Sequence, residues 1–162
     1  MFAVVPNGTQ IFVYTPGKGY DVGTYDDLEN SFGAPVGAMT LVPGQGVFIK
    51  NNAAAAFTVT FVGEVPQGNL KTDLVAGLQI VSSQVPQAGT TDQLNFPDKL
   101  AEGLTGGDQV YKFNTTSQKY DVFTFDDLED KWDNALSLDV GEAVFVRVAK
   151  ALSWSRTFNV NQ

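Results

Sequence analysis

The sequence predicts a mainly β protein, an antiparallel sandwich or barrel built from two pseudo-repeats that each contain one short helix. An internal repeat is the main observation: YDVGTYDDLENSF at Tyr20–Phe32 returns as YDVFTFDDLEDKW at Tyr120–Trp132, with eight of thirteen residues identical. Runs of β-branched and aromatic residues, separated by turns rich in Pro, Gly and Asn, are typical of strands. Two copies of such a unit indicate a repeated supersecondary structure.

The first copy spans about residues 9–63 and opens with a predicted hairpin. Gln10–Tyr14 is rich in apolar and aromatic residues and predicts a strand, Pro16–Gly19 predicts the loop, and Tyr20–Thr24 predicts the returning strand. Three further strands are predicted later in this copy, at Met39–Val42, Val47–Ile49 and Phe57–Phe61.

A short helix is predicted directly after the hairpin. Thr24 suits a helix N-cap, and Asp27 stands three residues later, at the position of a capping box. Acidic residues in the first turn also suit the helix dipole. Gly33 would end the helix, and Leu28 and Phe32, four positions apart, would face the core together.

The second copy spans about residues 108–160 and follows the same order. Its hairpin begins at Gln109–Phe113, and its later strands correspond to those of the first copy at an offset of 97 rather than 100. This change places a three-residue deletion in a loop, where a change of length costs little. The matched segments are Val140–Val146 with Pro43–Ile49, and Trp154–Phe158 with Phe57–Phe61.

Residues 64–107, the connector, carry apolar residues throughout and are predicted to be ordered, with a strand at Leu78–Ser82. Nothing equivalent precedes Gln10, so the first copy lacks a partner for such a strand. We expect one compact domain over residues 1–162, with both copies contributing to it.

Composition excludes several classes of function. With 18 acidic and 10 basic residues the net charge is −8, which disfavours nucleic acid and anionic membrane surfaces as partners. No apolar run reaches the length of about 18 residues that a membrane span needs. The chain has no cysteine and no histidine, so thiol chemistry and the commonest general base are missing.

The repeated Asp-Asp-Leu-Glu motif could be read as a site for a hard cation such as calcium. Helix capping explains the same acids without a metal, and the glycine-centred loop of an EF-hand is absent. A hydrolase built on paired acids is a weaker alternative, because identical acids in both copies indicate a structural role. We therefore expect a protein that is not an enzyme and that uses no metal or other cofactor.

Four tyrosines flank the predicted hairpin loops and are the candidate ligand-binding residues, because exposed aromatic rings can stack on sugars. Most aromatic residues recur at strand positions in both copies and are expected in the core. The candidates are Tyr14, Tyr20, Tyr111 and Tyr120.

Several strings extend over most of the chain from Gly63 to Val160: GEVPQG-x-L, G-x-x-x-VSS-x-VPQ-x-G, GDQVYKFN, VGEAVFV and W-x-R-x-F. They resemble an uncharacterised family of tandem β-rich modules found in secreted or surface proteins of bacteria. The resemblance implies an extracellular, cell-surface or virion-associated protein, and it implies no catalytic or binding residue.

The function expected from these observations is a non-catalytic structural or surface module, a self-associating subunit of the filament, coat or virion-decoration type. The alternative is a carbohydrate-binding module of a secreted protein, with a polysaccharide as its partner. For the first reading, a sheet edge near Gln10–Thr15 or Phe57–Gly63 would meet a neighbouring subunit. Residues 1–6 or the Leu78 strand could instead cover that edge within one chain.

Overall fold

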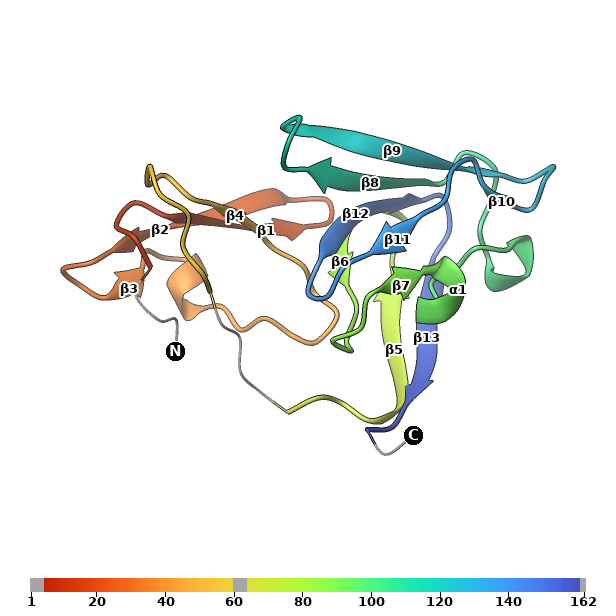
Figure 1. Ribbon diagram of the computed structural model, residues 1–162, viewed down its shortest axis with the longest axis horizontal. Coiled ribbons are helices and arrows are strands. Elements are labelled where there is room, and N and C mark those ends of the chain that lie inside the picture. The colour runs from red at the N-terminus through yellow and green to blue at the C-terminus, as the bar shows by residue number, and fades with distance from the viewer. Residues whose placement is uncertain (1–4, 60–63, 161–162) are drawn as a thin grey trace. The chain divides into compact units, whose positions relative to one another are not determined.

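The computed structural model describes residues 5–59 and 64–160 (Figure 1). Contacts divide the chain into two compact units: the first contains Met1–Leu41 and Val47–Glu64, and the second contains Val42–Gly46 and Val65–Gln162. One compact domain is predicted from the sequence, and the buried residues of the structure form one core cluster in each unit. From Val65 on, the connector belongs to the second unit.

The first unit is a four-stranded antiparallel sheet with strand order β3-β2-β1-β4. A short 3₁₀ helix, η1 (Val36–Ala38), lies between β3 and β4 in the chain. The strands are β1 (Gln10–Thr15), β2 (Gly19–Asp26), β3 (Ser31–Phe32) and β4 (Phe48–Lys50).

The second unit is an antiparallel sandwich. Its largest sheet has five strands in the order β10-β9-β8-β12-β6, and two-stranded sheets β13-β5 and β11-β7 complete it. The large sheet contains β6 (Gly77–Ser82), β8 (Gln109–Asn114), β9 (Lys119–Asp126), β10 (Lys131–Trp132) and β12 (Ala143–Val148). The remaining elements are β5 (Gly68–Leu74), β7 (Gly89–Thr90), α1 (Thr91–Leu94), η2 (Leu100–Glu102), β11 (Ser137–Leu138) and β13 (Leu152–Phe158).

The two sheets share four strands in the same order and in corresponding register. In the first hairpin Tyr14 lies opposite Tyr20, and in the second Phe113 lies opposite Tyr120. Phe12 pairs with Phe48 across β1 and β4, as Tyr111 pairs with Phe145 across β8 and β12. The mainly β, antiparallel fold is thus confirmed, and β6 is the strand that the second sheet has in addition.

The helix predicted after each hairpin is wrong. Both segments are turns that link β2 to β3 and β9 to β10. Asp26 Oδ1 accepts hydrogen bonds from the backbone N–H groups of Leu28 (2.9 Å) and Glu29 (3.4 Å), and Asp126 does the same in the second copy. Such local bonds compete with helix formation. Leu28 is 93% exposed and does not face the core.

Other strand predictions fail only in the first copy. Met39–Val42 forms no strand, nor do residues 57–59 of the predicted strand Phe57–Phe61, whose last two residues lie outside the described part of the chain. Gln10–Thr15 lies between β2 and β4, so it is not the sheet edge that the sequence analysis expects. Residues 1–4, one candidate cover for that edge, also lie outside the described residues.

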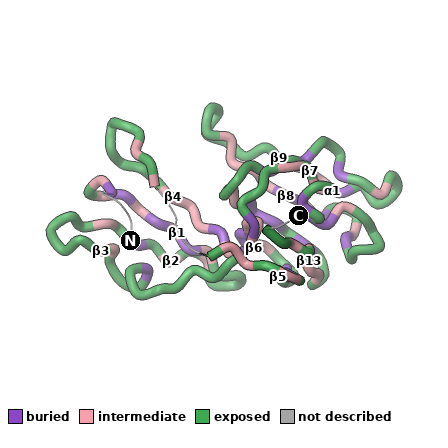
Figure 2. Tube along the Cα trace, turned by 60° about the horizontal axis from the view of Figure 1, so that its bottom comes forward, coloured by how far each residue is buried: buried purple, intermediate pink, exposed green. Residues whose placement is uncertain are grey.

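Buried residues lie on strands of both units (Figure 2), and the larger buried cluster belongs to the second unit. Fourteen buried residues form one cluster there, including Trp132 and Trp154. In the first unit the buried cluster consists of Ile11, Val13 and Val36, with half-buried Phe32, Val47 and Ile49 against it. Among the described residues, no helix is long and apolar enough to cross a membrane.

Candidate functional site

The four candidate tyrosines lie on the two hairpins, but they do not form a flat platform. Tyr14 and Tyr20 meet edge to face, with ring centroids 5.2 Å apart at 70°. Tyr120 makes edge-to-face contacts with Phe113 and Phe145, and partial burial raises its pKa above the ordinary tyrosine value. The Tyr111 hydroxyl donates a hydrogen bond to Gln109 Oε1 at 2.6 Å.

Of these tyrosines, Tyr20 and Tyr120 are the most exposed, at 48% and 42%. They stand at equivalent positions of the two hairpins. Because aromatic pairs of this geometry stabilise a hairpin on their own, the rings have a structural role. Tyr20 and Tyr120 therefore each present one partly exposed ring that edge-to-face contacts hold in place.

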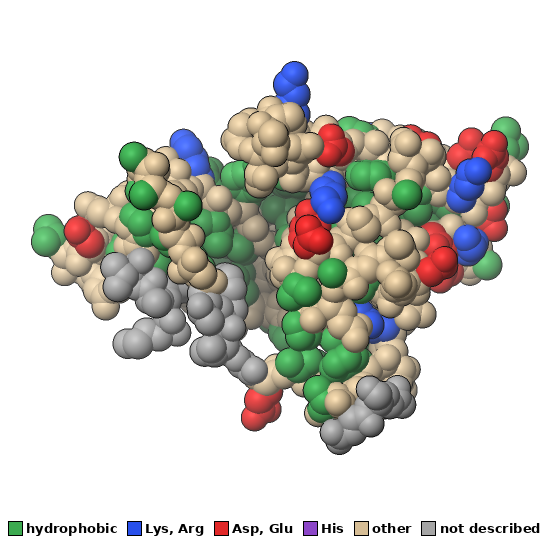
Figure 3. Space-filling model, in the orientation of Figure 1, with side chains coloured by type: hydrophobic (Ala, Val, Ile, Leu, Met, Phe, Trp, Pro, Cys, Tyr) green, Lys and Arg blue, Asp and Glu red, His purple; other side chains and the backbone are tan. Residues whose placement is uncertain are grey.

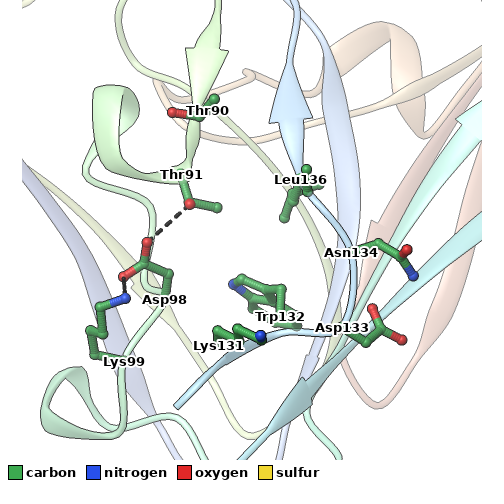
Figure 4. A pocket seen from close by; sticks show the side chains of 10 residues that line it. Thr90, Thr91, Asp98, Lys99, Lys131, Trp132, Asp133, Asn134 and Leu136 are labelled. Atoms are coloured by element: carbon green, nitrogen blue, oxygen red, sulfur yellow. Dashed lines mark hydrogen bonds and ion pairs between the residues drawn. The ribbon is translucent and has the colours of Figure 1, made fainter. Parts of the chain in front are cut away.

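A pocket of about 390 Å³ lies in the second unit, beside β10 (Figure 4). We call it the polar pocket because polar residue types line most of it: Thr90, Thr91, Asp98, Lys99, Lys131, Asp133 and Asn134. Trp132 lies between Lys131 and Leu136 in this view, and its Nε1 donates to the Pro97 carbonyl at 3.1 Å. Across the pocket the Asp98 carboxylate accepts a hydrogen bond from Thr91 Oγ1 at 2.9 Å and lies 3.4 Å from Lys99 Nζ. The connector therefore builds one wall of the pocket, and the second copy builds the other.

The equivalent place in the first unit is a larger, mainly apolar groove of about 540 Å³, which we call the first-unit groove. It lies beside β3, as the polar pocket lies beside β10, and the first copy supplies all its lining residues. The main apolar ones are Ile11, Val13, Phe32, Val36, Met39 and Leu41.

Equivalent residues are much more exposed in the first unit than in the second. Leu138 is 3% exposed, and Leu41, its equivalent at the offset of 97, is 38% exposed. Trp132 is 6% exposed, whereas Phe32 is half-buried. Residues that complete the core of the second copy therefore have equivalents in the first copy that line a groove.

The connector explains this difference, because it pairs with three strands of the second copy. Strand β7 pairs with β11, β6 pairs with β12, and β5 pairs with β13. In the first copy, the segments that correspond to β11 and β13 are Thr40–Leu41 and residues 57–59, and neither forms a strand. The strand that corresponds to β12 is β4, which has three residues where β12 has six.

The acidic turns are the residues that the sequence analysis weighed as a cation site. Among the described residues, no group of three or more acidic side chains is placed to hold a cation. The Glu129 carboxylate instead lies 2.6 Å from Lys131 Nζ, and this contact raises the pKa of Lys131. Acidic and hydrophobic side chains stand side by side at the β2–β3 and β9–β10 turns (Figure 3).

Sequence reasoning missed the groove, although its signal is present in the chain. The correspondence between the copies extends back to Val5 and Leu104, which are both buried. Residues 65–103 directly precede this correspondence in the second copy, and the apolar positions that they cover can be read from the repeat.

Comparisons with known proteins identify no relative: no family model, no curated protein and no solved structure matches this chain. Its class is defined by its fold alone, as a mainly β protein of antiparallel sheets.

Proposed function

We propose that this protein is a non-catalytic structural or surface module that joins a larger assembly through its first unit. The observation that carries the proposal is the contrast between the two copies: the second is completed by the connector, and the first exposes the equivalent apolar residues in a groove. Concave sites lined mainly by apolar side chains are the usual places where folded proteins bind partners or ligands. The resemblance to tandem surface modules supports an extracellular, cell-surface or virion-associated setting.

Self-association is the form of assembly that we expect, through a contact that buries more than about 1,000 Å² in total. Sedimentation velocity of the pure protein over a range of micromolar concentrations tests it. Reversible growth of the sedimentation coefficient with concentration is expected. A strict monomer at every concentration would contradict self-association.

Leu41→Lys and Leu128→Lys form a matched pair for this experiment. Leu41 lines the groove. Leu128 is not among the groove's lining residues and is 93% exposed at the β9–β10 turn. Both substitutions add one positive charge to an exposed leucine, so they have the same effect on net charge. Only Leu41→Lys should weaken association if the groove is the contact.

Carbohydrate binding is the second candidate function. The polar pocket favours it, since Asp98, Asp133 and Asn134 lie around Trp132, and hydroxyl groups suit such donors and acceptors. The exposed tyrosines of the two hairpins would provide further contacts. A glycan array tests this function, followed by the variants Asn134→Ala and Tyr120→Ala. Saturable binding to a defined glycan by a monomeric protein would favour this candidate over assembly.

A further inference from the structure

We infer that the first-unit groove is an acceptor for a polypeptide segment of a neighbouring chain, with the strand pattern and apolar residues of the connector segment 65–103. This inference rests on the proposed assembly role and names the chemistry of the partner. The occupant is specified by the protein itself, because the second copy shows which kind of segment completes this half of the fold.

Strand pairing is the first support. In the second unit one segment supplies β5, β6 and β7, and these pair with β13, β12 and β11. Pairing of β6 with β12 covers six residues, from Ala143–Ser82 to Val148–Gly77. A segment that repeats this pattern on the first unit would extend β4 and order Thr40–Leu41, by backbone hydrogen bonds that do not depend on side-chain identity.

Core filling is the second support. The connector segment inserts Leu74, Val81, Leu94 and Phe96 into the core of the second unit, each at most 3% exposed. The Phe96 ring lies 6.3 Å from the Trp132 ring and 5.0 Å from the Trp154 ring, measured between centroids. The equivalents of Trp132 and Trp154 in the first copy are Phe32 and Phe57. Because these are also aromatic, an aromatic side chain at the position of Phe96 suits the first-unit groove.

Size and polarity agree with an inserted segment. A volume of about 540 Å³ lined by aliphatic and aromatic side chains fits a few large apolar side chains. In the second unit Val110 and Leu138, the counterparts of Ile11 and Leu41, are buried in the core with Leu94 and Phe96 of the connector. The pocket that remains beside β10 has a volume of about 390 Å³. The segment that we infer would thus convert the groove into a packed core.

A labelled synthetic peptide of residues 65–103, added to the intact protein, tests the inference. Fluorescence anisotropy should show saturable binding of one peptide per chain in the micromolar range. Hydrogen exchange of the complex should show new protection at Thr40–Leu41 and β4. Leu41→Lys in the protein, or Phe96→Ser in the peptide, should weaken binding at least about tenfold, and Leu128→Lys should leave it unchanged.

Each other outcome overturns the inference. A scrambled peptide that binds equally well would show non-specific capture of apolar sequence. Protection confined to β11 and β12, insensitive to Leu41→Lys, would show exchange with the connector of the second unit. Full protection of Thr40–Leu41 in the protein alone, at a concentration where it is a monomer, would show that the groove is already covered.

The oligomeric state separates this inference from the proposed function. A dimer that protects the groove and excludes the peptide would show that a second copy occupies the groove. This result would support self-association and contradict a connector-like partner. Peptide binding to a protein that stays a strict monomer would contradict self-association and support the connector-like partner.

Discussion

Leu41 and Leu138 are equivalent leucines in the two copies, yet 38% of Leu41 is exposed and only 3% of Leu138 is. Leu138 lies on β11, which pairs with β7 of the connector, whereas Leu41 lies outside any strand. The difference arises from the segment that covers each residue, because the local sequences are similar: Thr-Leu at Leu41 and Ser-Leu at Leu138.

Replacing these two leucines by alanine should therefore have unequal effects. Leu138→Ala creates a cavity in a packed core and should lower the free energy of unfolding by about 2–5 kcal/mol. Leu41→Ala removes a partly exposed side chain and should cost less than about 1 kcal/mol. Urea unfolding followed by tryptophan fluorescence measures the first value, since both tryptophans lie in the second unit, and far-UV circular dichroism measures the second. Equal costs would show that the first unit is as well packed as the second.

Asp108 and Thr9 give a second matched pair, because each is buried directly before the hairpin of its copy. The Asp108 carboxylate accepts hydrogen bonds from the backbone N–H groups of Ala149 (2.8 Å) and Thr105 (2.9 Å). Thr9 Oγ1 is buried and has no hydrogen-bond partner within residues 5–59 and 64–160. Asp108→Ala leaves buried donors unpaired and should cost about 1–3 kcal/mol or more.

Thr9→Val should be neutral or stabilising by up to about 1 kcal/mol, because it removes a buried hydroxyl that makes no hydrogen bond and keeps the shape of the side chain. Thermal unfolding of the two variants measures both effects. A clear loss of stability in Thr9→Val would mean that the hydroxyl has a partner after all.

The acidic turns give a third prediction. Asp26→Ala and Asp126→Ala each remove two side-chain to backbone hydrogen bonds and should cost about 0.5–1.5 kcal/mol. Thr24→Ala and Thr124→Ala should change stability by no more than about 0.5 kcal/mol, because these residues lie in strands and cap no helix. The reverse order, measured by chemical unfolding, would restore the helix-capping interpretation.

Calcium should leave the melting temperature unchanged. The described acidic side chains form no cluster suited to a cation. At the turns, Asp26 and Asp126 accept hydrogen bonds from backbone N–H groups, and Glu129 pairs with Lys131. Differential scanning fluorimetry with millimolar calcium or with chelator measures the effect. A rise of several degrees that saturates with calcium would contradict this prediction, since only binding to the folded state raises the melting temperature.

The sequence predicts the strands and their pairing well wherever the signal is local. The hairpins at Gln10–Tyr14 and Gln109–Phe113, and the correspondence of Val47–Ile49 with Val144–Val146, are all found in the sheet registers. The offset of 97 between the later strands of the two copies can be read from the sequence, and it identifies equivalent residues such as Leu41 and Leu138.

The turns after the hairpins could not be assigned in this way. A Thr or Asp followed by acidic residues is a pattern shared by helix N-caps and by Asx turns, and only the pairing of Trp132 with Phe125 decides between them. Residues 57–59 form no strand for a different reason, because β13, their counterpart in the second copy, is formed by pairing with β5 of the connector.

Hydrogen exchange of the dilute, monomeric protein tests the central claim most directly, by comparing Thr40–Leu41 with Ser137–Leu138. If the first copy is incomplete, amides of Thr40 and Leu41 should exchange rapidly, those of Ser137 and Leu138 should exchange slowly, and the difference should disappear when the first unit is occupied in an assembly. Equal and strong protection of both segments in the isolated monomer would contradict the account.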